Sequence, residues 1–312
     1  MIVKPEKMDF SKKNILMILS GLPGTGKTTL ALSAQNVLLI DTDEGLCRVN
    51  PKHRKDASIC KTYEDILADI EDAKGVYNTL VIDTAGALID YMIDWVVRNE
   101  PKARKTTGGI SLQGFGYVKQ EFLRLCNELR KSFNVLFIFH EKIEKVGEDS
   151  RYTIICSGSA KEIVYMPADL AAHCFITNGQ RYLGFTPTEQ YTAKGAYGIK
   201  GIVSIPELKD GDKNDFLEKL FDLVRKNLAK ESEQAASEKG AYNAVMADGS
   251  ALIAEIEKPE DVEIVLKAID KLPHALTSKK ELIASLKAKL ATLNITYNQA
   301  SKTYVYANGA AV

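Results

Sequence analysis

One stretch near the start of the chain has the residue types and spacing needed to bind nucleotide phosphates. Residues Gly21-Leu22-Pro23-Gly24-Thr25-Gly26-Lys27-Thr28 fit the pattern G-x-x-x-x-G-K-[ST]. In such a loop the glycines let backbone N–H groups turn inward around the α- and β-phosphates, the lysine reaches the β- and γ-phosphates, and the final hydroxyl binds Mg²⁺. We therefore expect residues 21–28 and the adjoining Thr29 to bind a nucleoside triphosphate, with Thr28 as a ligand of Mg²⁺ and Lys27 acting on the reacting phosphates.

A carboxylate follows a buried apolar run at a position that suits magnesium chemistry. The run Thr79-Leu80-Val81-Ile82 ends in Asp83. In open α/β sheets ligands bind at the carboxyl ends of the strands. Asp83 is therefore predicted to be the carboxylate that accompanies such loops and supports the bound Mg²⁺ from outside its direct ligands. The alternative is a turn that only ends a strand.

Two further strand ends offer groups that could act on the γ-phosphate. The run 37–40 is followed by Asp41, Thr42, Asp43 and Glu44. Asp43 or Glu44 could activate the attacking water as a general base, and spacing does not separate them. His140 ends the run 135–139 and could hydrogen-bond the γ-phosphate. The alternatives are a solvated acidic turn and a histidine that caps a strand for structural reasons.

Alternating elements are predicted to position these groups. Short, nearly all-apolar strands are expected at 15–19, 37–40, 79–82 and 135–139, and helices at 62–74, 87–98 and 117–133, with another starting at 29–33. Such strands separated by helices indicate an α/β fold in which a mostly parallel sheet is flanked by helices. Beyond Pro187 short extended pieces are expected, and then a helix over 216–228.

The pattern changes near residue 228, and the sequence predicts two parts. Residues 1–228 form the nucleotide-binding core, and residues 229–312 form a linker and a small helical C-terminal region of unknown role. The stretch 229–240 indicates a linker or an exposed helix, and helices are expected over 259–272 and 278–293. The last dozen residues are weakly patterned and expected to be frayed.

Composition excludes some classes of protein and leaves others open. The 312 residues include 41 Lys and Arg and 41 Asp and Glu, so the formal net charge is zero and any nucleic-acid binding must come from a local patch. The five cysteines show no C-x-x-C spacing, which favours reduced, buried thiols in a cytosolic compartment. No apolar stretch resembles a signal peptide or a membrane span, so we expect a cytoplasmic protein with no membrane association.

Several motifs together resemble a known group of proteins. They are the loop at 21–28, the acidic strand end Asp41-Thr42-Asp43-Glu44-Gly45, Val81-Ile82-Asp83-Thr84, Ser111-Leu112-Gln113-Gly114-Phe115-Gly116, Phe137-Ile138-Phe139-His140-Glu141-Lys142 and Ala168-Asp169-Leu170. Over roughly residues 12–210 the chain resembles phage-encoded P-loop nucleotide-binding proteins with a core-only RecA-like ATPase fold. Members of that group are associated with single-strand annealing and recombination of phage DNA.

The resemblance implies a reaction and an assembly. It implies an ATPase that uses ATP and Mg²⁺ and is stimulated by DNA, in the host cytoplasm, with ATP held between subunits of a ring or filament. The family places a glutamate after the second strand as the base, but its D-x-E-G pattern has one extra residue here, which leaves the choice between Asp43 and Glu44 open. His140 matches the family's γ-phosphate sensor. Lys194 and Lys200 could reach the phosphates of an adjacent subunit, with ordinary surface lysines as the alternative.

A basic segment beside aromatic residues suits single-stranded DNA. Lys102, Arg104 and Lys105 lead into Phe115 and Tyr117, so charges could pair with phosphates while rings stack on bases. Residues 142–152 are a second candidate, diluted by acidic residues, and a solvated loop is the alternative for both. Partners expected from the resemblance are single-stranded DNA, further copies of the chain and, as a candidate, a single-strand-binding protein. An ATP-gated assembly or helicase-loading protein and, less favoured, a small-molecule kinase are alternative functions.

Overall fold

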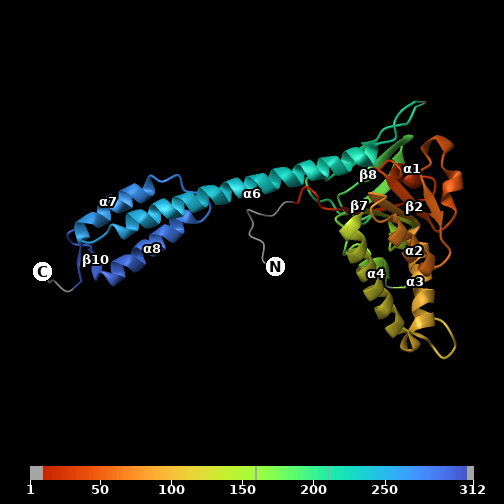
Figure 1. Ribbon diagram of the computed structural model, residues 1–312, viewed down its shortest axis with the longest axis horizontal. Helices are drawn as coiled ribbons and strands as arrows, with labels where there is room; N and C mark the ends of the chain where they lie inside the picture. The colour runs from red at the N-terminus through yellow and green to blue at the C-terminus, as the bar shows by residue number, and fades with distance from the viewer. Residues whose placement is uncertain (1–9, 159, 210, 308–312) are drawn as a thin grey trace. The chain divides into compact units, whose positions relative to one another are not determined.

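The structure is a computed structural model that describes residues 10–158, 160–209 and 211–307 (Figure 1). Residues 11–227 form one compact unit, and the described residues from Leu228 onward belong to a second. Helix α6 (Phe216–Ala254) begins in the first unit and ends in the second. None of the helices in the described part of the chain is both long enough and apolar enough to cross a bilayer.

The first unit is built on a nine-stranded, mostly parallel sheet. Its strand order is β3-β2-β4-β5-β1-β7-β8-β9, with β6 pairing to the far end of β5. Strands β3, β2, β4, β5, β1 and β7 are parallel, and β8, β9 and β6 each run antiparallel to a neighbour. The strands are β1 (Leu16–Gly21), β2 (Val37–Asp41), β3 (Ala57–Ile59), β4 (Thr79–Asp83), β5 (Asn134–Val146), β6 (Asp149–Ile154), β7 (Leu170–Thr177), β8 (Gln180–Gly184) and β9 (Ile202–Ile205).

Helices cover this sheet and bury its apolar residues. The helices of the unit are α1 (Lys27–Ala31), α2 (Tyr63–Ala73), α3 (Ala85–Asn99), α4 (Leu112–Ser132), α5 (Ala160–Ile163) and the start of α6. Leu16, Ile18 and Phe137 pack into one core with residues of α2, α3 and α4. Met17 and Leu19, which alternate with them along β1, are also fully buried. Both faces of the central strands are therefore covered, as all-apolar parallel strands require.

Local caps explain where the long helices begin. Thr62 and Asp65 form a reciprocal capping box at α2. The hydroxyl of Thr84 accepts from Ala87 N–H at the start of α3, and that of Ser111 accepts from Gly114 N–H at the start of α4. The Ser111 cap starts α4 at Leu112, five residues before the start expected from hydrophobic periodicity alone.

The α/β fold with a mostly parallel sheet is confirmed, and the differences are local. The helix after the phosphate loop spans only Lys27–Ala31, because the chain turns at once toward β2. Strand β5 runs past His140 to Val146 and forms a hairpin with β6. This hairpin was not predicted, because residues 141–154 are rich in charged side chains and only pairing with each other makes them strands.

The second unit packs the end of α6 with α7 (Pro259–Asp270), α8 (Ser278–Thr292) and a hairpin of β10 (Ile295–Asn298) and β11 (Thr303–Tyr306). Val245, Val262, Leu282 and Ile295 lie in its apolar core. Residues 229–240, expected as a linker or an exposed helix, are a mostly exposed part of α6, the helix that joins the two units. The expectation of frayed residues at 301–312 is wrong for 303–306, which pair as β11, while residues 308–312 lie outside the described residues.

Candidate functional site: a phosphate loop at the carboxyl edge of the sheet

The phosphate loop has a conformation that depends on its glycines. It leaves β1 at Gly21 and enters α1 at Lys27. Gly24 and Gly26 have φ values of 84° and 87°, in the left-handed region that glycine tolerates best. At Gly21 a Cβ atom would lie 2.4 Å from the carbonyl oxygen of Cys174 on β7. The loop is therefore wrapped closely against the sheet, with its backbone exposed toward a cavity.

Lys27 is held at the start of this loop. Its ammonium donates to the carbonyl oxygens of Gly21 and Leu22, each at 2.9 Å. Burial lowers the pKa of Lys27, against the raising influence of nearby groups such as Asp83. A desolvated cation forms stronger electrostatic contacts than one in water, so its position suits a polyphosphate.

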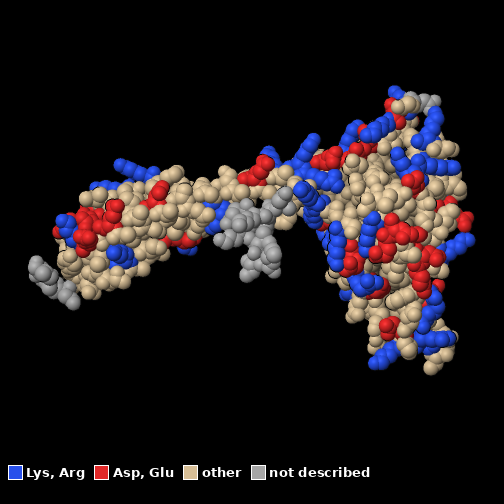
Figure 2. Space-filling view, viewed as in Figure 1, with Lys and Arg blue, Asp and Glu red and all other residues tan. Residues whose placement is uncertain are grey.

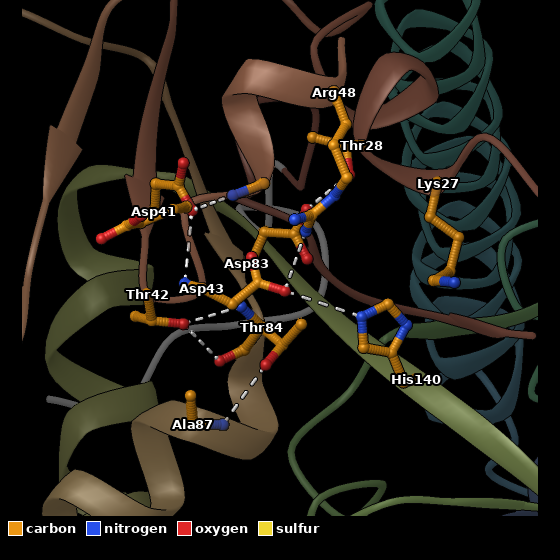
Figure 3. Close-up of polar contacts among 12 residues, drawn as sticks. Lys27, Thr28, Asp41, Thr42, Asp43, Arg48, Asp83, Thr84, Ala87 and His140 are labelled. Atoms are coloured by element: carbon orange, nitrogen blue, oxygen red, sulfur yellow. Dashed lines mark hydrogen bonds and ion pairs between the residues drawn. The ribbon is translucent and has the colours of Figure 1, made fainter. Parts of the chain in front are cut away.

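Thr28 and Asp83, the two residues predicted to act on Mg²⁺, are in direct contact. The Thr28 hydroxyl donates to Asp83 Oδ2 at 2.6 Å (Figure 3). Burial raises the pKa of Asp83 to about 6, with Asp43 and Asp41 adding to the effect and the Thr28 hydrogen bond opposing it. A buried carboxylate so close to a hydroxyl is poised for a divalent cation, which would favour its charged form.

The three carboxylates at the end of β2 and in the turn that follows it have different surroundings. Asp41 accepts from the N–H groups of Gly45 and Leu46, at 2.8 and 2.9 Å, and so shapes the turn. Asp43 lines the cavity beside the phosphate loop. Glu44 has a left-handed φ of 56° and is exposed outside that lining. The extra residue in this turn thus places Asp43, and not Glu44, at the phosphate cavity.

His140 and Arg48 also line the cavity, and both lie beside Asp43. His140 Nε2 lies 3.7 Å from Asp43 Oδ2, and Arg48 lies 3.2 Å from the same oxygen (Figure 3). Burial lowers the pKa of His140, and the Lys27 charge lowers it further. Arg48 was not predicted, because nothing in its sequence context marks it and only the 3-10 turn η2 (Gly45–Arg48) brings it to the cavity.

These residues fit a nucleotide with a bound Mg²⁺. The cavity has a volume of about 450 Å³ and is lined by loop residues together with Asp43, Arg48, Asp83 and His140. Asp43 Oδ1 and His140 Nδ1 are buried and make no hydrogen bond with another described residue. Both residues line the cavity. Within the described ranges no three His, Cys, Asp or Glu side chains cluster as a ready metal cage. Mg²⁺ would therefore be held by Thr28 with phosphate oxygens and water, near Asp83.

A second cavity adjoins the first across the phosphate loop. It has a volume of about 300 Å³ and shares Gly26 and Thr29 with the phosphate cavity. Leu30, Ile205 and Phe216 supply apolar lining, and Asn214 donates to the Thr29 carbonyl at 2.8 Å. The Arg181 guanidinium, also not predicted, covers Gly26, where a Cβ would lie 3.1 Å from its Nε.

Of the two lysines expected to act on a neighbouring subunit, Lys194 is tied to the start of β7. Lys194 donates to the carbonyl of Ala168, just before β7, at 2.5 Å, and its backbone bridges to Ala171. The first residues of β7 lie at the sheet edge opposite Gly21, because β7 is parallel to β1. Lys200 is exposed. Action on a second subunit stays a prediction for both.

The expected DNA-binding residues are only partly exposed. Lys102, Arg104 and Lys105 are exposed between α3 and α4, and Figure 2 shows basic side chains at this end of the unit. Phe115 packs on Gly158, whose added Cβ would lie 2.3 Å from the ring. Tyr117 packs against the main core. The structure thus presents the charges to solvent and turns part of each ring inward, and the DNA role of this segment stays a prediction.

The fold and this constellation define a P-loop NTPase. The family described as "AAA domain" matches residues 13–197, more than half of the chain, so the chain belongs to this AAA domain family. No curated protein matches the sequence.

Two solved structures are similar at low sequence identity. An ATPase from the type III secretion system of pathogenic bacteria is 12% identical, with a TM-score of 0.38, covering 89% of this chain and 81% of its own. The flagellar accessory protein FlaH from Methanocaldococcus jannaschii is 12% identical, with a TM-score of 0.30, covering 62% of this chain and 91% of its own.

Proposed function

We propose that this protein is a Mg²⁺-dependent ATPase that acts on single-stranded DNA in phage recombination or annealing. The observation that carries the ATPase part is the meeting of Lys27, the Thr28–Asp83 pair and the free polar atoms of Asp43 and His140 around one cavity. The DNA part is supported by the motifs shared with phage RecA-like proteins and by the exposed basic segment.

Each group has a definite task in this proposal. Lys27 binds the β- and γ-phosphates, and Thr28, near Asp83, would hold a Mg²⁺ ion whose charge would polarise the γ-phosphate. Asp43 orients the attacking water and accepts its proton, because it lines the cavity and its Oδ1 has no hydrogen-bond partner among the described residues. His140 donates a hydrogen bond to the γ-phosphate, and its lowered pKa keeps the ring neutral near pH 7.

In this proposal the adjoining cavity binds the nucleoside part of ATP. A nucleotide whose phosphates follow residues 21–28 would direct its sugar and base past Thr29 into the 300 Å³ cavity. Leu30, Ile205 and Phe216 would contact the flat base, and Arg181 would lie near the α-phosphate.

The proposed function also includes DNA binding and self-assembly. Lys102, Arg104 and Lys105 pair with phosphates of single-stranded DNA, and the chain forms a ring or filament in which Lys194 and Lys200 approach a neighbouring ATP. DNA binding at this segment would align subunits and raise turnover.

ATP turnover measured with and without single-stranded DNA tests the proposal. Stimulation that disappears when Lys102, Arg104 and Lys105 are replaced by Gln, while basal turnover stays, is the expected result. Slow turnover indifferent to DNA would favour an ATP-gated assembly protein instead. Sedimentation with ATP and DNA should show oligomers, and a strictly monomeric protein with full stimulation would refute the shared-site assembly.

A further inference from the structure

The charges of the second unit are separated along the chain. Residues 228–270 carry four lysines against ten Asp and Glu, a formal charge of −6. Residues 271–307 carry six lysines against one glutamate, a formal charge of +5. The neutral total of the protein hides this separation. The positive part coincides with α8 and the β10–β11 hairpin.

The single acidic side chain of this positive part is already engaged. Glu281 accepts hydrogen bonds from Tyr242 and Thr277. Of the six lysines, Lys279 pairs with Asp270 at 2.8 Å. Lys280, Lys287 and Lys302 are exposed, and within residues 10–158, 160–209 and 211–307 no carboxylate forms an ion pair with them. Their charges are available to an anion from outside.

Helix α8 presents two of these lysines on one side. Leu282, Leu286 and Leu290 face the core, four residues apart. Lys280 and Lys287 are seven residues apart, so they lie on a common face about 10 Å from each other. The exposed Ala284 lies between them, and its small side chain leaves room for a chain of phosphates to approach the helix.

The hairpin that follows α8 adds exposed aromatic rings. Two residues separate the end of α8 from the start of β10, which packs beside it. Its register pairs Tyr297 with Tyr304 and Ile295 with Tyr306, so these four side chains share one face. Ile295 is buried in the core, whereas Tyr297 and Tyr306 are 52% and 40% exposed. Exposed rings on a hairpin that packs against the lysine-bearing α8 match what a single-stranded nucleic acid requires, since bases stack while phosphates pair.

We propose that α8 and the β10–β11 hairpin form a second binding surface for single-stranded nucleic acid, made by Lys280, Lys287, Lys302, Tyr297 and Tyr306. The surface lies outside the nucleotide-binding unit and works without ATP. It shares with the proposed function only the choice of ligand, so each can fail without the other.

The test measures binding of a labelled oligothymidylate to the full chain by fluorescence anisotropy, without nucleotide. In the variant Lys280→Gln/Lys287→Gln/Lys302→Gln three phosphate contacts are lost. The log–log salt slope should then be shallower by about 2, and the ratio of wild-type to variant affinity should shrink by about 20-fold between about 50 and 200 mM salt. Tyr297→Ala should weaken binding by at least about 5-fold, and Tyr297→Phe, which keeps the ring, should bind as the wild type does.

A matched control removes the same charge from the acidic part of the unit. Lys230→Gln/Lys258→Gln/Lys267→Gln should leave affinity and salt slope unchanged. An equal loss in both triple variants would show a general charge effect and overturn the proposal, as would wild-type affinity in the first variant or equal binding of duplex DNA. Circular dichroism of each variant checks that the unit is folded, and basal ATP turnover should be unchanged in all of them.

Discussion

Asp83→Asn should make the nucleotide-free protein more stable at neutral pH while it removes Mg²⁺-dependent turnover. Burial raises the pKa of Asp83 from 3.8 to about 6. The folded chain therefore binds more protons than the unfolded chain between these values, so the free energy of unfolding falls as pH rises through this window. One pKa unit corresponds to about 1.4 kcal/mol, and the buried charge costs about 3 kcal/mol at pH 7.

The amide of the Asp83→Asn variant removes the free-energy cost of the buried charge, but it adds a smaller cost of its own. Its carbonyl oxygen can still accept from Thr28, as Asp83 Oδ2 does now. Its NH₂ group is buried without a prepared partner, at a cost of about 1 kcal/mol. We therefore expect a net gain of about 2 kcal/mol at pH 7, which raises the melting temperature by about 4–8 °C. Near pH 4 the wild-type carboxyl is neutral in the folded chain but about half ionised in the unfolded chain, so the variant should be less stable by only about 0.5 kcal/mol.

Thermal unfolding of both proteins at pH 4 and pH 7, without nucleotide, measures this change of sign. Asp72→Asn removes an equal charge from an exposed position on α2 and should show no such dependence. ATP turnover against Mg²⁺ concentration is measured on the same samples. A stability difference that is the same at both pH values would refute the burial argument, and unchanged Mg²⁺ dependence would refute the role of Asp83.

Four further substitutions test other parts of the site. Lys27→Ala should weaken ATP binding by about 100-fold and abolish turnover, since a charge-assisted contact is worth about 3 kcal/mol; calorimetric titration measures the affinity, and parental turnover would refute the assignment. Asp43→Asn should lower kcat by at least about 100-fold, whereas Glu44→Gln should leave kcat within about two-fold, because of these two carboxylates only Asp43 lines the phosphate cavity. Steady-state kinetics measures both values, and a larger loss in Glu44→Gln would make Glu44 the base. Gly21→Ala should destabilise the protein by about 1–3 kcal/mol in chemical unfolding, since its Cβ would lie 2.4 Å from a backbone oxygen; an unchanged midpoint would mean that the loop yields at this point.

The sequence alone predicted those parts of the protein whose conformation depends on residues close together along the chain. The phosphate loop was predicted from spacing, because its conformation depends on glycines within the same eight residues. The parallel sheet was predicted because strands buried on both faces must be apolar throughout. Asp83 and His140 were placed at one edge by the rule that parallel strands end together, and the register of β1, β4 and β5 places them there.

Tertiary structure decided whatever depends on residues far apart in the sequence. Spacing could not separate Asp43 from Glu44, and the separation comes from Asp41 accepting two N–H groups and turning the chain. Arg48 and Arg181 reach the nucleotide cavities from elements that carry no motif. The strands after Glu141 and after Leu293 exist because each pairs with a partner, and pairing partners leave little trace in a short polar sequence. Sequence thus determined the chemistry of the loop, and tertiary packing decided which side chains surround it.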